Sequence, residues 1–179
     1  VLDTEALDRG ARNYLAAVHM AGEGNYYLAL VDASTGHRRT YQLDTLHQVI
    51  DELHRADATE LLVGVNSPLH SSIEAYGARV PVTEIDIPKG DDEMVADSML
   101  ETYLASTQMN TALALQPRQR CERLDAMGLA AATVRNLELV RCTVDGSRKN
   151  ALIGLLDKTR TAMGARLLKE WLLYPLTDV

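Results

Sequence analysis

Short β-type segments alternate with amphipathic helical segments along the N-terminal half of the chain. Residues 13–20 and 25–33 are apolar and rich in β-favouring side chains, and residues 22–25 between them have the composition of a turn. A second turn at 34–36 leads into a third β-type segment over 37–43. The pattern therefore predicts a meander of three antiparallel strands.

Helices and two further strands follow the meander. Asp44 is a candidate N-cap for a helix whose apolar side chains recur at helical spacing. Residues 60–65 are a short, wholly apolar run, which is typical of a buried strand. The remaining predicted elements are a helix containing Ile73 and Tyr76, a strand over 80–87, and a helix over 91–108 with Ala96, Leu100, Tyr103 and Leu104 facing inward. This order predicts an α/β fold, with a mixed sheet flanked by helices.

The last third of the chain has helical periodicity only. Residues 129–140, 151–159 and 163–174 repeat apolar side chains at helical spacing, and Asn150 is the candidate N-cap of the second helix. In the third helix we expect an apolar stripe of Met163, Leu167, Leu168, Trp171 and Leu172, with Arg166, Lys169 and Glu170 facing away. Three short helices with such wide apolar faces cannot bury them on one another. We therefore expect an all-α segment taken from a larger helical core domain.

The net charge of −7 hides a change in composition along the chain. Residues 1–117 carry 7 basic and 18 acidic side chains, whereas residues 118–179 carry 11 basic and 7 acidic ones. This contrast predicts two units with different neighbours. We divide the chain into an α/β domain over 1–108, a linker over 109–121 and truncated helices over 122–179. We expect the chain to be an excised fragment of a longer protein.

Several functional classes lack their sequence motifs. The chain contains no GxxxxGK[ST] phosphate loop, no GxSxG nucleophile elbow and no GxGxxG dinucleotide fingerprint. No apolar run has the length of a membrane span, and we expect no export leader. Cys121 and Cys142 do not have the spacing of metal ligands, so we expect free thiols in a reducing, cytoplasmic setting.

Asp32 is the first candidate for chemistry, because it stands where a predicted strand meets a turn. Strand-end aspartates begin the sites of metal-dependent nucleases, but one carboxylate cannot hold a divalent metal alone. The other predicted strands offer only Asn66 and the distant Asp86. The alternative is that Asp32 is a turn residue ahead of Gly36, with its side chain bonded to the local backbone.

Two further sets of polar residues have a functional and a structural interpretation. His47, Asp51 and His54 share one face of a predicted helix and could ligate a metal, or they could form a solvated polar face. A larger basic set could follow a phosphate backbone, or it could consist of ordinary surface charges. Its members are Arg118, Arg120, Arg123, Arg135, Arg141, Arg148 and Lys149. From the residues alone we assign no catalytic, cofactor-binding or metal-binding residue.

Ordered motifs in the last third resemble a known family. The stretches LDAMGLAAATVRNLELV and NALIGLLDKTRTAMGARLLKEWLLYPLTD are similar to the start of the core domain of MutS DNA mismatch-repair proteins. The pattern there is an LDAATRRNLEL-like helix, a Leu-rich helix ending in DxTxTxMG, and then RLLxxWLxxPL. The AMGLA stretch before Ala131 departs from it as an apparent insertion. NYLAAV, LALVDASTG, ELL and TYLASTQ in the first unit are similar, in the same order, to the connector domain of that family.

The resemblance implies a fold and a set of partners. Full-length members are dimers that clamp mismatched DNA, with a mismatch-reading domain bearing a Phe-x-Glu wedge, an RNase H-like connector, a helical core and an ATPase that uses ATP and Mg²⁺. This chain has no Phe and no phosphate loop. The resemblance therefore implies a non-enzymatic connector plus the first core helices, without a cofactor of its own. It would relay ATP-dependent conformational change and offer a docking surface to a MutL-type partner.

Two competing hypotheses stay open at this point. One is an RNase H-like nuclease, or a nucleic-acid-binding domain, centred on Asp32. The other is a stand-alone DNA-binding module formed by residues 118–179, whose affinity would fall steeply with salt.

Overall fold

The chain folds into two compact units, which are described separately below. The first, the α/β unit, spans Asn13–Glu122, and the second, the helical unit, comprises Val1–Arg12 and Arg123–Val179. The computed structural model describes residues 14–22, 24–76, 80–90, 92–107, 114–121 and 127–177.

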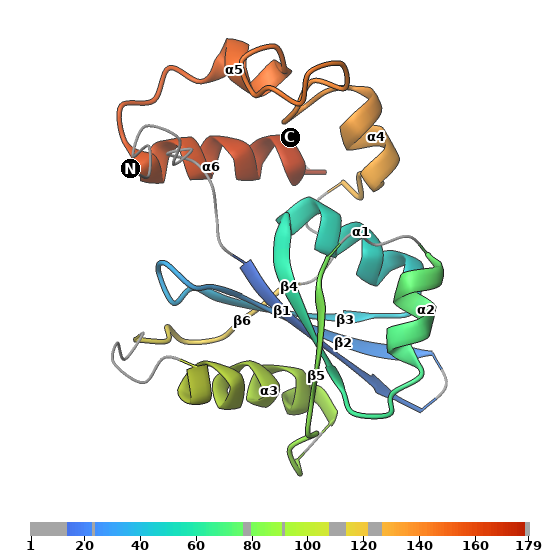
Figure 1. Cartoon of the computed structure of the whole chain (residues 1–179). Helices are drawn as coiled ribbons and strands as arrows, with labels where there is room; N and C mark the ends of the chain where they lie inside the picture. Colours follow the sequence, from blue (N-terminus) through green and yellow to red (C-terminus); the bar gives the residue numbers. More distant parts are fainter. Residues whose placement is uncertain are drawn as a thin grey trace, which may run out of the picture. The chain divides into compact units, whose positions relative to one another are not determined.

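A mixed sheet of six strands forms the centre of the α/β unit (Figure 1). β1 (Tyr14–Ala21), β2 (Asn25–Asp32) and β3 (Arg38–Leu43) pair antiparallel, as the sequence predicts. β4 (Ala58–Gly64) pairs parallel to β1, and β5 (Val82–Ile85) pairs parallel to β4. The strand order is β5-β4-β1-β2-β3-β6, so β1 and β2 lie at the centre.

The sixth strand was not predicted. β6 (Gln119–Arg120) lies within the stretch that sequence patterns indicate to be a linker, and it pairs parallel to β3. Two residues carry no readable periodicity, so a pattern of alternation could not reveal this strand. β5 is also shorter than the predicted strand over 80–87.

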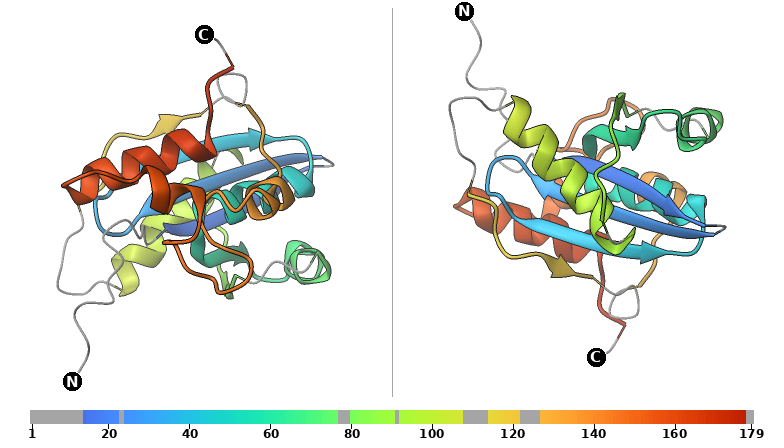
Figure 2. Two further views of the ribbon diagram at one scale, coloured as in Figure 1. Left: turned by 90° about the horizontal axis from the view of Figure 1, so that it is seen from above. Right: turned by 90° about the horizontal axis from the view of Figure 1, so that it is seen from below.

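Helices cover both faces of the sheet (Figures 1 and 2). Successive side chains of β1 therefore lie alternately in two cores, one on each face. Tyr14, Ala16 and Val18 face a core that includes side chains of α1 (Leu46–Ala56) and α2 (Leu69–Ala75). Leu15 and Ala17 face the other core, with α3 (Asp92–Thr107). Figure 2 shows α3 running across the strands on its side of the sheet. Both faces of the central strands are buried, which explains their continuous apolar runs.

The N-cap of α1 and the burial of one side chain of α3 differ from the prediction. The N-cap of α1 is Thr45 and not Asp44, because the Thr45 hydroxyl accepts a hydrogen bond from the Gln48 amide at 3.3 Å. The Gln48 side chain in turn accepts a bond from the Asp44 amide at 2.9 Å, close to a capping box. In α3 the predicted inward residues Ala96, Leu100 and Leu104 are buried. The fourth, Tyr103, is half-buried and donates its hydroxyl to Glu60.

The described residues of the helical unit form three helices and a small buried core. The helices α4 (Ala131–Asn136) and α5 (Leu152–Leu156) are shorter than the apolar periodicity predicts, whereas α6 (Ala162–Leu173) has the predicted length and begins one residue earlier. Its buried apolar side chains are those of Leu139, Ala151, Ile153, Ala165 and Leu173. The amides of Leu152 and Ile153 donate to the carbonyls of Glu138 and Leu139, which ties α5 to the end of α4.

Carboxylates organise the loops of the helical unit. The Glu138 carboxylate accepts bonds from the amide and hydroxyl of Thr143, and its backbone φ is +48°. The Asp145 carboxylate accepts from the Ser147 amide at 2.8 Å and from the Asn150 side chain at 2.7 Å. Asn150 is therefore occupied in this loop and does not cap α5, whose N-cap is Ala151 without a side-chain bond.

The loop before α6 uses the same chemistry. The Asp157 carboxylate accepts from the amide and hydroxyl of Thr159 and pairs with Arg148. The Thr161 hydroxyl caps α6 by accepting from the Gly164 amide at 3.1 Å. A side chain at Gly154 would collide with the backbone, because its Cβ would lie 2.3 Å from the Arg148 carbonyl oxygen.

The orientation of α6 only partly matches the predicted apolar stripe. Met163, Leu167 and Trp171 are exposed, while Leu168 and Leu172 are half-buried. Lys169, predicted to face away, is 8% exposed and shares the inward face with Ala165 and Leu173. These three recur four residues apart, so they define the face that the described residues cover.

We expect the core around α3 to contribute strongly to the stability of the α/β unit. Met99 is fully buried there, so Met99→Ala should lower the free energy of unfolding by about 2–5 kcal/mol through the cavity that it leaves. The same change at Met163, which is 80% exposed, should cost about 0.5 kcal/mol or less. Urea unfolding of both variants measures the difference, and equal costs would contradict the assigned core.

The Asp145 loop should weaken in acid. The Ser147 amide and the Asn150 side chain stabilise the carboxylate and lower the pKa of Asp145 from 3.8 to about 2. The stabilisation is therefore complete above pH 3.8 and is lost as the pH falls through about 2. An NMR titration of this carboxyl group measures the pKa directly, and Asn150→Ala should move it back towards 3.8 because one donor is removed. A pKa near 3.8 in the unmodified chain would disprove the loop geometry.

Candidate functional site

Asp32 ends β2 and serves the turn that follows. Its side chain is buried, with the residue 3% exposed, and the carboxylate accepts bonds from the amide and hydroxyl of Ser34 at 2.9 and 2.5 Å. Its carbonyl oxygen accepts from the amides of Thr35 and Gly36. These bonds are those of a turn residue and agree with the structural interpretation of Asp32.

The sheet topology separates Asp32 from the other polar groups at strand ends. Asp32 pairs with Tyr14, the first residue of β1. β4 and β5 run parallel to β1, so Asn66 and Asp86, which follow their last residues, lie at the opposite end of the sheet. Across the described ranges, no three His, Cys, Asp or Glu residues are arranged to hold a metal ion. Neither Asn66 nor Asp86 is therefore placed to share a two-metal nuclease site with Asp32.

The side chains of His47, Asp51 and His54 on α1 are not arranged around a common metal position. His47 and His54 are exposed, as predicted for a solvated face, whereas Asp51 is buried at 8% exposure. His47 Nε2 and Asp51 Oδ2 lie 3.9 Å apart, which is the separation of a weak i, i+4 ion pair. Helical spacing alone therefore overstated both the solvation of Asp51 and the metal-binding potential of the set.

Three members of the basic set are paired with acids inside their own unit. Arg120 lies 3.2 Å from Glu93, and Arg118 lies 3.8 Å from the same carboxylate. Arg148 is paired with Asp157 at 2.5 Å. Contact with a phosphate would have to replace these partners, which favours the interpretation as structural charges.

Three of the other four basic residues are exposed in the helical unit. Arg135 is exposed on α4, and Arg141 and Lys149 are exposed in loops of the helical unit. Arg123 lies outside the described residues.

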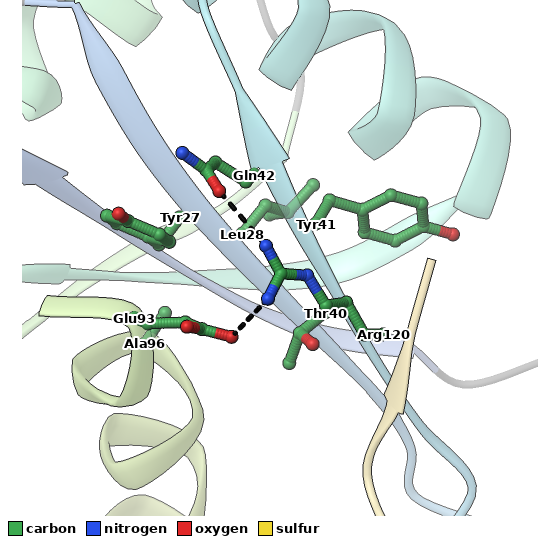
Figure 3. Close-up of a pocket in the computed structure, with 8 residues that line it drawn as sticks. All are labelled: Tyr27, Leu28, Thr40, Tyr41, Gln42, Glu93, Ala96 and Arg120. Carbon is green, nitrogen blue, oxygen red and sulfur yellow. Dashed lines mark hydrogen bonds and ion pairs between the residues drawn. The ribbon is translucent and has the colours of Figure 1, made fainter. Parts of the chain in front are cut away.

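A shallow pocket lies between β3 and α3 (Figure 3). It is lined by Tyr27, Leu28, Thr40, Tyr41, Gln42, Glu93, Ala96 and Arg120. The Arg120 guanidinium lies between Gln42 and Glu93, at 3.2 Å from each side-chain oxygen. The polar groups at its mouth thus bind one another, and the lining contains no histidine or cysteine beside a hydroxyl that could be a nucleophile.

A partly buried charge cluster centred on Arg38 is the feature that sequence reasoning missed. Arg38 donates to the Asp97 carboxylate at 3.1 Å, to the Glu101 carboxylate at 2.5 Å and to the Gln116 carbonyl oxygen at 2.9 Å. The Arg38 and Asp97 side chains are 13% and 4% exposed. Burial raises the pKa of Asp97, and the positive charge of Arg38 opposes that rise.

A signal for this cluster was present in the sequence. Asp97 and Glu101 are four residues apart on α3, so they share a face, and Asp97 adjoins the buried Ala96. An acid beside the apolar stripe of a helix calls for a cation on the element that it covers. Arg38 is the cation that β3 supplies.

The described part of the chain contains no helix that is both long and apolar enough to cross a membrane.

Comparison with known proteins connects these features to a family. The family described as MutS domain III matches residues 132–179. Among similar proteins, the DNA mismatch repair protein MutS of Bacillus velezensis is 33% identical over 188 residues, covering 98% of this chain and 22% of the relative. MutS of Bacillus subtilis is 33% identical over 191 residues, covering 100% and 22%. MutS of Anaeromyxobacter dehalogenans is 34% identical over 204 residues, covering 100% and 23%.

The matched segment contains the loop carboxylates and caps described above. In the DxTxTxMG motif, Thr159 donates to Asp157 and the Gly164 amide donates to Thr161 at the start of α6, so these positions have a structural explanation. The similarity extends through the α/β unit, because the relatives align with almost the entire chain. The chain spans about a fifth of the length of these relatives, and it belongs to the MutS family of DNA mismatch-repair proteins.

Proposed function

We propose that this chain is the connector and the beginning of the helical core of a MutS-type protein, with a mechanical and not a catalytic role. It links a mismatch-reading part to the core and ATPase parts of the parent and relays ATP-dependent conformational change between them. The parent binds mismatched duplex DNA as a dimer in the cytoplasm, and ATP and Mg²⁺ belong to its ATPase part. This chain carries no cofactor of its own.

The observation that carries this proposal is the two-sided core of the α/β unit. Five consecutive residues of β1, Tyr14 to Val18, are each 6% exposed or less and feed the two cores alternately. A unit packed on both faces resists internal deformation, because close-packed interiors have low compressibility and do not deform continuously. A displacement at one end of such a unit therefore reaches the other end as a rigid-body movement.

The exposed residues of α6 support the assignment to a larger core. Trp171 is 65% exposed and Met163 80% exposed, and with Leu167 they recur four residues apart on one face. Leu155, at 70%, adds to the exposed apolar surface of this unit. Since the relatives are more than four times as long as the matched region, we assign this face to further core helices of the parent.

The α/β unit also carries exposed acidic side chains, to which we assign the docking of a MutL-type protein. Asp44, Glu74 and Asp86 are exposed and lie before α1, within α2 and after β5, respectively. Charges at the rim of an interface accelerate encounter and fix orientation. A single reversal at the docking face should therefore weaken binding measurably.

Charge reversal locates the docking surface. Among Asp44→Arg, Glu74→Arg and Asp86→Arg, we expect at least one to weaken binding to a MutL-type protein by about tenfold, through repulsion and lost steering. Asn136→Arg, at an exposed position of the helical unit, is the matched control and should bind normally. Calorimetry or surface plasmon resonance with the 179-residue chain measures the affinities. If all three variants bind as tightly as the control, the docking role is refuted.

The competing nuclease hypothesis has a direct test at Asp32. We expect no cleavage of single-stranded, duplex or hybrid nucleic acid by this chain in Mg²⁺ or Mn²⁺, because the carboxylate is bonded to Ser34. Gel assays over several hours compare the unmodified chain with Asp32→Asn, which keeps one oxygen acceptor for the turn. Cleavage that disappears in Asp32→Asn would overturn the mechanical role in favour of catalysis.

A further inference from the structure

The segment of residues 114–121, here named the strap, is fastened along the open edge of β3. The Gln116 amide donates to the Gly36 carbonyl oxygen at 2.9 Å, and the Cys121 amide donates to the Thr40 carbonyl oxygen at 2.9 Å. Between these two bonds, β6 pairs in parallel with Arg39 and Thr40. The strap is therefore part of the sheet, although sequence patterns predict a linker there.

Arg38 holds the strap to two other elements at once. From β3 its guanidinium reaches Asp97 and Glu101 of α3, while its Nε donates to the Gln116 carbonyl oxygen. A planar guanidinium with donors on several edges is suited to joining three elements in one plane. Two more ion pairs add to this attachment, since Arg118 and Arg120 of the strap both approach Glu93 of α3.

Gly36 shows how closely the strap is seated. A Cβ at this position would lie 2.2 Å from the Ala114 carbonyl oxygen, which is a collision with backbone and not with a movable side chain. The backbone φ of Gly36 is +73°, so glycine is favoured here for conformation as well as for space.

The strap nevertheless has the character of a segment that can open. Its strand is two residues long, and most of its side chains are exposed. Its apolar contacts are those of Leu115 with the α3 core and of Cys121 with the core on the other face of the sheet. Few buried apolar contacts and exposed backbone hydrogen bonds are the marks of low local stability. Its attachment thus depends on polar bonds that a competing interaction can replace.

We propose that the strap is a releasable joint of the α/β unit, with Arg38 as the residue that locks it. While it is seated, the chain leaves the unit at a fixed point beside Thr40, and movement of the unit is passed on directly. Release of its eight residues frees roughly 26 Å of chain, which turns a rigid joint into a slack tether. This inference rests on the proposed relay function and names the place where the relay is interrupted.

Two glycine substitutions separate seating of the strap from backbone strain. Gly36→Ala and Gly22→Ala both force alanine into positive φ, at +73° and +61°, but only the first meets the strap, since nothing lies within 4 Å of a Cβ at Gly22. We expect the amides of Gln116 and Cys121 to exchange hydrogen at least tenfold faster in Gly36→Ala than in Gly22→Ala. Amides at the centre of β2 serve as an internal reference for intact folding. Equal strap exchange in the two variants would overturn the proposal.

A second variant tests the lock without touching the backbone. Arg38→Gln keeps a polar side chain but removes the charge and the fork, so the same two amides should again exchange at least tenfold faster. Arg135→Gln, which neutralises an exposed arginine of the helical unit, is the control and should leave them unchanged. Unchanged hydrogen exchange at these two amides in Arg38→Gln would contradict the proposal that Arg38 locks the strap. These measurements need no DNA, nucleotide or MutL-type protein, so their failure is distinct from failure of the docking test.

Discussion

The α/β unit depends on one constraint, the burial of both faces of its central strands. Because β1 sends alternate side chains to opposite sides, neither helix layer can be removed without exposing the strand. This explains why charged residues on the covering helices, such as Asp97 and Glu52, are accompanied by arginines where they reach the interior. The rigidity that the proposed mechanical role requires is thus a consequence of how the sheet is covered.

The helical unit is organised by different forces. Its buried apolar residues are few, and Glu138, Asp145 and Asp157 order its loops by accepting bonds from amides and hydroxyls of nearby residues. Such bonds fix local geometry but contribute little cohesion between helices. A segment of this kind gains stability mainly from surfaces that it meets elsewhere, which agrees with the exposed residues on α5 and α6.

Sequence patterns predicted the elements that repeat over several turns or strand residues and missed those that depend on single contacts. The meander and α3 were predictable because each of these elements extends over six to sixteen residues, enough for composition and turn residues to mark it. β6 was not, since two residues have no period, and Asn150 was assigned to a cap because its competing bond to Asp145 is invisible in sequence. Lys169 was predicted to be exposed for a related reason. The apolar stripe indicated which face of α6 should be buried, but the described neighbours cover the face that carries Ala165, Lys169 and Leu173.

The exposure of Trp171 has a practical consequence. It is the single tryptophan of the chain, and its indole stands on the apolar face of α6 with 65% of its surface accessible. Indole emission depends on the polarity around the ring, so the molecule carries an intrinsic optical probe at the place where the remainder of a MutS core would cover it. Docking of complementary helices can therefore be followed by a change in fluorescence colour, without attaching a dye.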